Sequence, residues 1–302
     1  MGTIFRMRIM LYILIMVSIM LMPGCANFSN VDVRSSYFSP QWSPQGEIIC
    51  IKNRMAVSGG KGGGFGGSGT SFSPYYYLTR LNPSDFTERD LLFIGSDLIG
   101  IGELSLSPLG NYYVYKTYKK LNIISSNGDL VINIALDDEY ASFDWAPDES
   151  KLVLLKNGIL NIVDRASGNI ILISTIEAYE PSWRYAEKIV FYGKQNDIYY
   201  LSFIRPDGTG LEMTTLTLET TGAYPQYSPD GSKVYTIWTN YIRQIDASTK
   251  SIVNTTIASN DSFAHKISPD GTKLLGEDDN IWNYYIFTTD LDGSNRKNIV
   301  TW

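Results

Sequence analysis

Apolar and polar positions alternate in short segments that recur along the chain. In six places, two mostly apolar residues flank one polar residue, a period of two that is typical of a β-strand with two different faces. The flanking pairs are Pro40 and Trp42, Leu104 and Leu106, Phe143 and Trp145, Pro181 and Trp183, Pro225 and Tyr227, and His265 and Ile267. The residues between them are Gln41, Ser105, Asp144, Ser182, Gln226 and Lys266.

A turn sequence follows each of these segments. Ser-Pro-Asp-Gly occurs at Ser228–Gly231 and Ser268–Gly271, and worn copies occur at Ser43–Gly46, Ser107–Gly110 and Ala146–Glu149, with a degenerate copy around Trp183-Arg184-Tyr185. Proline sets φ for the first central position of a type I turn, and glycine suits its last position. Pro108 to Pro147 and Pro229 to Pro269 are 39 and 40 positions apart, and the 82 positions from Pro147 to Pro229 fit two units with the degenerate copy between them. The 64 positions from Pro44 to Pro108 fit one unit with an insertion, so the chain contains six units.

Each unit also contains a later hairpin. Its turns are Asn127-Gly128, Ser167-Gly168, Asp207-Gly208 and Asp292-Gly293, with Asn82–Asp85 and Ala247–Thr249 in the two remaining units. Asn-Gly and Asp-Gly are strong hairpin signals. Each unit therefore has about four strands, which is one blade of a β-propeller, and stacking between neighbours buries both faces of a blade. We expect an all-β chain that forms a six-bladed β-propeller of four-stranded antiparallel blades.

The repeat core resembles that of the TolB-like propellers, Pro-x-Trp-Ser-Pro-Asp-Gly-(Ser/Thr)-Lys, and the resemblance covers nearly all of residues 36–302. It implies the propeller fold. It does not imply one function, because the same repeat is similar to the non-catalytic propellers of TolB, of prolyl-oligopeptidase-type enzymes and of many surface proteins.

The first residues have a different character. Arg6 and Arg8 precede an uncharged apolar run from Ile9 to Met22, which is shorter than a spanning helix needs, and Cys25 follows Gly24. This arrangement resembles a bacterial lipoprotein signal, which implies removal of residues 1–24, acylation of Cys25 with palmitate-type chains, and membrane anchoring. An ordinary signal peptide or an uncleaved anchor is the alternative. Residues 25–35 would then form a tether.

The predicted location follows from the same resemblance. The protein would be a membrane-anchored lipoprotein that faces the periplasm or the cell exterior. Because Ala26 rather than Asp follows Cys25, the family rule favours the outer membrane if the cell is Gram-negative.

The net charge and the cysteine content restrict the possible binding partners and the possible disulfides. Loss of residues 1–24 removes two arginines and changes the formal charge from -6 to -8. An acidic surface disfavours nucleic acid as a partner. Cys50 lies in a strand pattern and would be alone after acylation of Cys25, so no disulfide is expected.

The sequence offers little catalytic chemistry. His265 is the only histidine, which excludes a site with several histidine ligands and the histidine-rich sites of propeller lyases. No Gly-x-Ser-x-Gly sequence occurs. Asp290–Asn295 partly resembles a calcium loop but fits a hairpin turn better. We therefore expect a protein that is not an enzyme and has no metal site or cofactor.

A glycine-rich insertion occupies residues 58–71 in the first unit. Gly64–Gly69 fits the Gly-x-Gly-x-x-Gly pattern of dinucleotide-binding loops, but strand-like segments flank the insertion and no helix follows, as phosphate binding would require. A flexible hairpin loop is the preferred interpretation, and a loop that regulates or touches a partner is the alternative.

Topology indicates where a binding surface would lie. The segments that precede the six inner strands should surround one mouth of the central channel, and acidic residues recur there: Glu103, Asp138, Glu139, Glu177, Glu180 and Asp261. These residues form either a solvated rim or a binding mouth for a basic or hydroxyl-rich partner.

The sequence thus favours a monomeric, lipid-anchored envelope propeller that binds or scaffolds an envelope protein. A carbohydrate- or small-ligand-binding propeller is one alternative. A hydrolase or lyase that uses carboxylates at the mouth is another. A deep pocket with two facing carboxylates would favour the enzyme, and a broad aromatic mouth would favour the protein partner.

Overall fold

The computed structural model describes residues 33–58, 71–95, 103–117, 119–136, 141–217, 224–238, 241–257, 263–280 and 283–300. Two compact units are distinguished. One contains residues 35–54 and 74–302, and therefore nearly all described residues. The other contains residues 1–34 and 55–73, in which the structure describes only the ends of three strands.

Twenty-four described strands form six sheets of four. The first three sheets contain β1 (Val33–Trp42), β2 (Ile48–Ser58), β3 (Ser71–Leu81) and β4 (Glu88–Gly95); β5 (Leu104–Leu106), β6 (Tyr112–Thr117), β7 (Lys120–Ser125) and β8 (Leu130–Ala135); and β9 (Phe143–Trp145), β10 (Lys151–Lys156), β11 (Ile159–Asp164) and β12 (Ile170–Leu172). The last three contain β13 (Ala178–Ser182), β14 (Ile189–Gln195), β15 (Ile198–Ile204) and β16 (Glu212–Thr217); β17 (Tyr224–Tyr227), β18 (Lys233–Trp238), β19 (Tyr241–Asp246) and β20 (Ile252–Ile257); and β21 (Phe263–Ile267), β22 (Lys273–Asn280), β23 (Asn283–Asp290) and β24 (Lys297–Val300).

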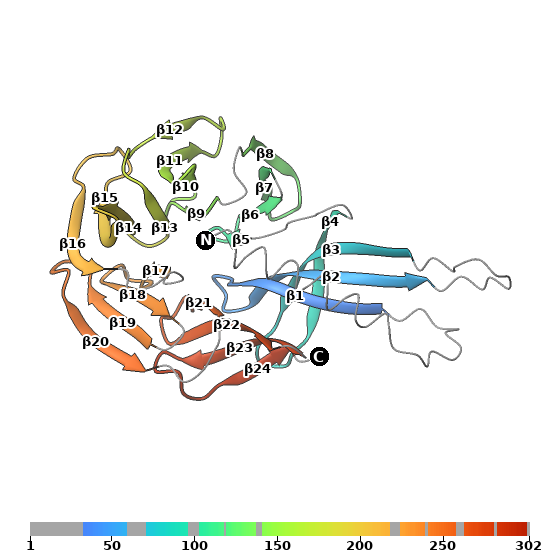
Figure 1. The fold of residues 1–302 in the computed structure, drawn as a ribbon. Coiled ribbons are helices and arrows are strands. Elements are labelled where there is room, and N and C mark those ends of the chain that lie inside the picture. Colours follow the sequence, from blue (N-terminus) through green and yellow to red (C-terminus); the bar gives the residue numbers. More distant parts are fainter. Residues whose placement is uncertain are drawn as a thin grey trace, which may run out of the picture. The chain divides into compact units, whose positions relative to one another are not determined.

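Each sheet is one blade made from a continuous stretch of chain, with its strands in sequence order. Figure 1 shows the blades following one another around a common centre, and the described residues contain no helix. The predicted six-bladed β-propeller of four-stranded antiparallel blades is therefore confirmed. Blade 1 is made entirely of β1–β4 and blade 6 entirely of β21–β24, so the described strands close the ring without a strand shared between the chain ends.

Hydrophobic clusters fill the interfaces between neighbouring blades, which we call seams. The second strand of a blade contributes to two seams at once. In β10, Leu152 and Leu154 pack with the cluster that joins blade 3 to blade 2, whereas Val153 and Leu155 pack with the cluster that joins blade 3 to blade 4. All four side chains are buried, which explains why such strands are apolar at every position rather than at alternate positions.

The seam between blades 6 and 1 closes the ring. Trp42 and Cys50 of blade 1 pack in one cluster with Leu275 and Ile286 of blade 6. The Trp42 indole Nε1–H also donates a hydrogen bond to the main-chain carbonyl of Lys266 at 3.1 Å. Closure therefore depends on the same side-chain packing that joins the other blades.

The Ser-Pro-Asp-Gly turns have the predicted local geometry and an additional contact. In the fifth blade, the Gly231 N–H donates to the Ser228 carbonyl at 2.8 Å, and Gly231 adopts φ = 68°. A Cβ atom on Gly231 would lie 2.7 Å from the carbonyl oxygen of Tyr185 in blade 4. The glycine is thus required both by its backbone conformation and by the approach of the preceding blade.

In blade 3, the turn contacts the preceding blade through a side chain instead of through a close approach of a glycine to its main chain. Glu149 occupies the glycine position of its turn at φ = 60°. Its carboxylate accepts hydrogen bonds from the Leu109 N–H at 2.7 Å and the Asn111 Nδ2–H at 2.9 Å, both in blade 2. The fourth turn position therefore contacts the preceding blade even where the glycine is lost.

Several features predicted from the sequence lie wholly or partly outside the described residues. The signal peptide, the lipidation site Cys25 and most of the tether precede the described residues, and most of the glycine-rich insertion lies outside them. Cys50 lies in β2 as predicted, where it is buried, and its thiol donates to the Thr79 carbonyl at 3.7 Å. Within the described part of the chain, no helix is long and apolar enough to cross a membrane.

We predict that Gly231→Ala destabilises the propeller more than Gly46→Ala. Gly46 has φ = 80° and no heavy atom within 4 Å of an added Cβ, so its replacement should cost only the left-handed backbone conformation, about 1–2 kcal/mol. Gly231→Ala adds a clash with a main-chain oxygen. Urea unfolding of both variants measures the difference, and equal losses would contradict a role for this glycine in the seam.

Candidate functional site

Two rings of side chains face the centre of the propeller. The first ring, which we call the mouth ring, contains Ser39, Glu103, Ser142, Glu180 and Tyr224, which lie five residues before the turn proline or, in blade 4, before Tyr185 at the equivalent position. The second, which we call the middle ring, lies three residues before the same position and contains Gln41, Ser105, Asp144, Ser182, Gln226 and Lys266. Because strand side chains alternate between faces, both rings lie on one side of the inner strands.

These rings enclose a cavity of about 220 Å³, to which every blade contributes. All eleven residues named in the two rings line it. Residues from between the rings, among them Leu104 and Phe143, also border it, but the side chains of these two pack in the hydrophobic clusters between blades. The side chains that face the cavity from the two rings are therefore mostly polar.

A charged network crosses three blades in the middle ring. Asp144 of blade 3 accepts a hydrogen bond from the Trp183 N–H of blade 4 at 2.9 Å and lies 3.6 Å from the Arg184 guanidinium. Arg184 also donates to the Ser105 hydroxyl of blade 2 at 2.9 Å. The charges of this network thus satisfy one another, and the network joins blades 2, 3 and 4.

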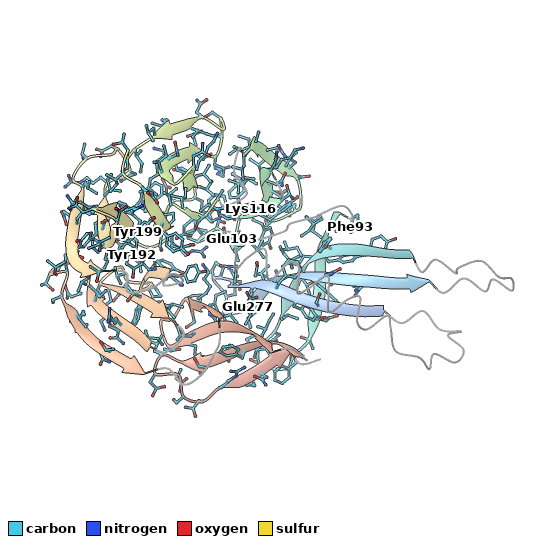
Figure 2. The ribbon with its side chains drawn as sticks, in the orientation of Figure 1. Phe93, Glu103, Lys116, Tyr192, Tyr199 and Glu277 are labelled. Atoms are coloured by element: carbon cyan, nitrogen blue, oxygen red, sulfur yellow. The ribbon has the colours of Figure 1, made fainter. Side chains whose placement is uncertain are left out.

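Glu103 and Glu180 occupy the mouth ring of blades 2 and 4, with Ser142 of blade 3 between them in ring order. The Ser142 hydroxyl donates to Glu180 Oε2 at 2.9 Å. Glu103 Oε2 is buried and has no hydrogen-bond partner among the described residues. Figure 2 marks Glu103 and Glu277 toward the middle of the ring of blades, with Lys116 close to Glu103.

The surroundings of both carboxyl groups favour their protonated forms. Burial and the Glu103 carboxylate raise the pKa of Glu180 to about 7, and the Ser142 hydrogen bond partly opposes this rise. Burial also raises the pKa of Glu103, while the charges of Lys116 and Lys266 oppose the shift. Perturbed carboxyl groups of this kind are common at functional sites, although structural networks also produce them.

The cavity has an excess of acidic groups. Four acidic residues line it, Glu103, Asp144, Glu180 and Glu277, against the two basic residues Arg184 and Lys266, which gives a formal charge of -2 when all are ionised. In the described part of the chain, no group of three or more acidic, histidine or cysteine side chains is arranged to hold a metal ion.

Only some of the six predicted mouth residues line the cavity in the structure. Glu103 and Glu180 line one cavity, as a common mouth would require. Glu177, three residues before Glu180, does not line it: its carboxylate pairs with Lys194 at 3.0 Å and accepts a hydrogen bond from the Tyr199 hydroxyl. Asp138, Glu139 and Asp261 lie outside the described residues.

Other lining residues were not singled out as candidates. Ser142 and Tyr224 could have been found from the sequence, because each stands one residue before a flanking apolar pair, where the alternation places another channel-facing side chain. Arg184 and Glu277 lie outside this pattern and required knowledge of how the blades curve. The structure describes the backbone of His265 in β21 but not its side chain.

Blade 1 contains a second charged cluster, which differs from the cavity. Lys52 is 2% exposed, and its ammonium forms ion pairs with Glu88 and, at 3.6 Å, with Asp90. Asp90 also pairs with Arg54 at 2.9 Å. Buried charge is compensated here within one blade, as stability requires.

No protein-family model matches the chain, and no curated protein matches its sequence. Solved structures match its fold. A putative TolB from Agrobacterium tumefaciens shares 16% identity with a TM-score of 0.57, and covers 74% of this chain and 87% of its own. At this identity the likeness shows a β-propeller fold similar to that of this TolB.

Other propellers match this TolB-like fold to a similar degree. A chain of a nidogen/laminin complex shares 12% identity with a TM-score of 0.55, and covers 75% of this chain and 89% of its own. An oligogalacturonate lyase in complex with manganese shares 13% identity with a TM-score of 0.50, and covers 90% of this chain and 85% of its own. At these identities the likeness concerns the fold alone.

We predict that Glu180→Gln makes stability less sensitive to pH between about pH 4.5 and 7. The folded state raises the pKa of Glu180 and so binds more protons than the unfolded state in this window; its contribution to stability is therefore lost as pH rises. Glutamine cannot ionise but can still accept the Ser142 hydrogen bond. Compared with the wild type, the variant should gain stability at pH 8 relative to pH 5 in urea unfolding.

Glu212→Gln is the matched control on the same blade. A hydrogen bond from Lys188 is the main cause that lowers the pKa of Glu212, so the contribution of its ionised form to stability is lost only as pH falls below the ordinary glutamate range. Glu212→Gln should therefore lower stability to a similar extent at pH 5 and pH 8 and leave the pH profile in this window nearly unchanged. A Glu180→Gln variant with the same pH profile as the wild type would contradict the buried, shared environment of Glu180.

Proposed function

We propose that this protein is a non-catalytic, lipid-anchored envelope propeller, and that it binds a protein partner at the channel mouth. One observation carries the binding proposal: all six blades contribute side chains to a single small polar cavity. Such a cavity can receive a protruding group of a partner whose remaining surface contacts the surrounding blades.

The size of the cavity ranks the alternatives. Pockets for small ligands are usually about 300–1,000 Å³. The cavity here is about 220 Å³, which suits one side chain better than an oligosaccharide or a large metabolite. The size therefore supports a protein partner over the carbohydrate- or small-ligand-binding alternative.

A carboxylate enzyme is the second candidate, and a specific observation favours it. Glu103 and Glu180 line one enclosed cavity, and the pKa of Glu180 is raised to about 7, as a general acid requires. The same cavity leaves little room for a sugar chain between the carboxyl groups. We therefore place this candidate below the binding module.

The anchoring part of the proposal is based on the sequence around Cys25. The lipoprotein-type signal accounts for the charged start, the apolar run and the position of the cysteine together. With the anchor attached, the propeller is monomeric and faces the periplasm or the cell exterior. An envelope protein is then the partner within reach.

We expect a photo-reactive phenylalanine derivative in place of Glu177 to crosslink a defined protein in intact envelopes. Glu177 precedes inner strand β13, is 51% exposed and does not line the cavity, so the probe should sit beside the mouth without blocking it. Denaturing electrophoresis followed by mass spectrometry identifies the adduct.

The same probe at Leu109 is the control, because Leu109 is 62% exposed in the turn after an inner strand, at the opposite end of the strand. Equal protein adducts from both positions, or adducts with lipid only, would contradict binding at the mouth. If neither probe gives an adduct and the protein cleaves an oligosaccharide, the enzyme becomes the better proposal.

Lipid anchoring predicts that Cys25→Ala abolishes incorporation of radiolabelled palmitate, since the thiol is the acceptor. The Cys50→Ala variant should keep full labelling, because Cys50 is buried in β2. Palmitate labelling that persists in Cys25→Ala would refute the anchor.

A further inference from the structure

Glu103 has a buried carboxyl oxygen that no described residue satisfies with a hydrogen bond. Its Oε2 atom is buried without a hydrogen-bond partner, although Glu103 lines the cavity. A carboxylate loses its hydration when it is buried, and native structures normally replace the lost water with donors. A donor supplied from outside would complete this site.

Comparison with the other buried charges strengthens this argument. Asp144 pairs with Arg184, and Lys52 pairs with Glu88 and Asp90. Neither Glu103 nor Glu180 forms an ion pair with another described residue. The charges of Lys116 and Lys266 only partly oppose the rise in the pKa of both carboxyl groups, and the residues that line the cavity keep a formal excess of two negative charges when all are ionised. The missing donor is therefore expected to be cationic.

The shape of the site selects the kind of cation. Glu103 and Glu180 approach the cavity from blades 2 and 4, with Ser142 of blade 3 bonded to Glu180. Acceptors that converge from separate blades suit an ammonium group, which has three donors pointing in different directions. A guanidinium prefers a planar, two-point contact with one carboxylate.

We propose that the cavity binds the side chain of one lysine from a partner protein, with its ammonium held by Glu103 and Glu180. This inference rests on the proposed binding function and specifies its chemistry. Glu103 supplies the unpartnered acceptor, and Glu180 supplies the second negative charge. The remaining surface of the partner is not constrained by this site.

The test uses the full-length chain in detergent and three peptides with the sequence Ac-Gly-Gly-X-Gly-Gly-amide. X is lysine, Nε-acetyl-lysine or norleucine, so that only the lysine peptide carries the charge. NMR titration at pH 8 should show saturable binding of the lysine peptide and at least tenfold weaker binding of the other two. Equal binding of the lysine and norleucine peptides would overturn the proposal.

Variants locate the binding site. Glu103→Gln should weaken binding of the lysine peptide at least tenfold, whereas Glu212→Gln, an exposed change on an outer strand, should leave it unchanged. Thermal melting checks that both variants fold. If Glu103→Gln folds and binds lysine like the wild type, the site is elsewhere and the inference fails. Stronger binding of an arginine peptide would also overturn the choice of an ammonium.

The outcomes separate the inference from the proposed function. If mouth probes capture a protein but the lysine peptide does not bind, the protein-binding function stands and the lysine inference is wrong. If the lysine peptide binds through Glu103 but mouth probes capture no protein, the cavity is a site for small amines and the proposed function fails.

Discussion

Packing at the seams is the constraint on which the rest of the structure depends. Each blade is a continuous piece of chain, and the described strands include none that is exchanged to lock the ring. The seam between blades 6 and 1, which contains Trp42 and Leu275, must therefore close the propeller by side-chain packing, the same interaction that joins the blades at the other seams. Because the second strands are buried on both faces, polar side chains concentrate on the inner strands, and the ring brings them together at its centre.

That convergence has an energetic consequence. Six inner strands surround a small cavity in which charged groups are partly or fully removed from solvent, so the energetic cost of each charge depends on its neighbours. Asp144 and Arg184 neutralise one another and connect three blades. Burial, together with the charge of Glu103, raises the pKa of Glu180. The channel thus contains a structural charge pair in its middle and two carboxyl groups at its mouth that have no evident structural benefit. These two carboxyl groups suggest a site for a ligand.

The sequence predicted the parts of the fold that depend on local chemistry. The turn at Ser228–Gly231 and the strand beside it follow from neighbouring residues, and their spacing gives the number of blades. Contacts between blades could not be predicted in this way, because Glu149 bonds to Asn111, and Arg184 to Ser105, only once the ring exists. The sequence predicted only part of the site. Glu177 and Glu180 belong to one acidic segment, and the sequence could not show that strand geometry directs only Glu180 into the cavity.

A crystal structure of the full chain with the lysine peptide tests the central claim, that the channel is a receptor for one cationic group. The account predicts the peptide ammonium nitrogen about 2.7–2.9 Å from Glu103 Oε2, the spacing of a charge-assisted hydrogen bond. A cavity in which Glu103 is instead satisfied by a shared proton with Glu180, with the lysine bound elsewhere, would contradict it.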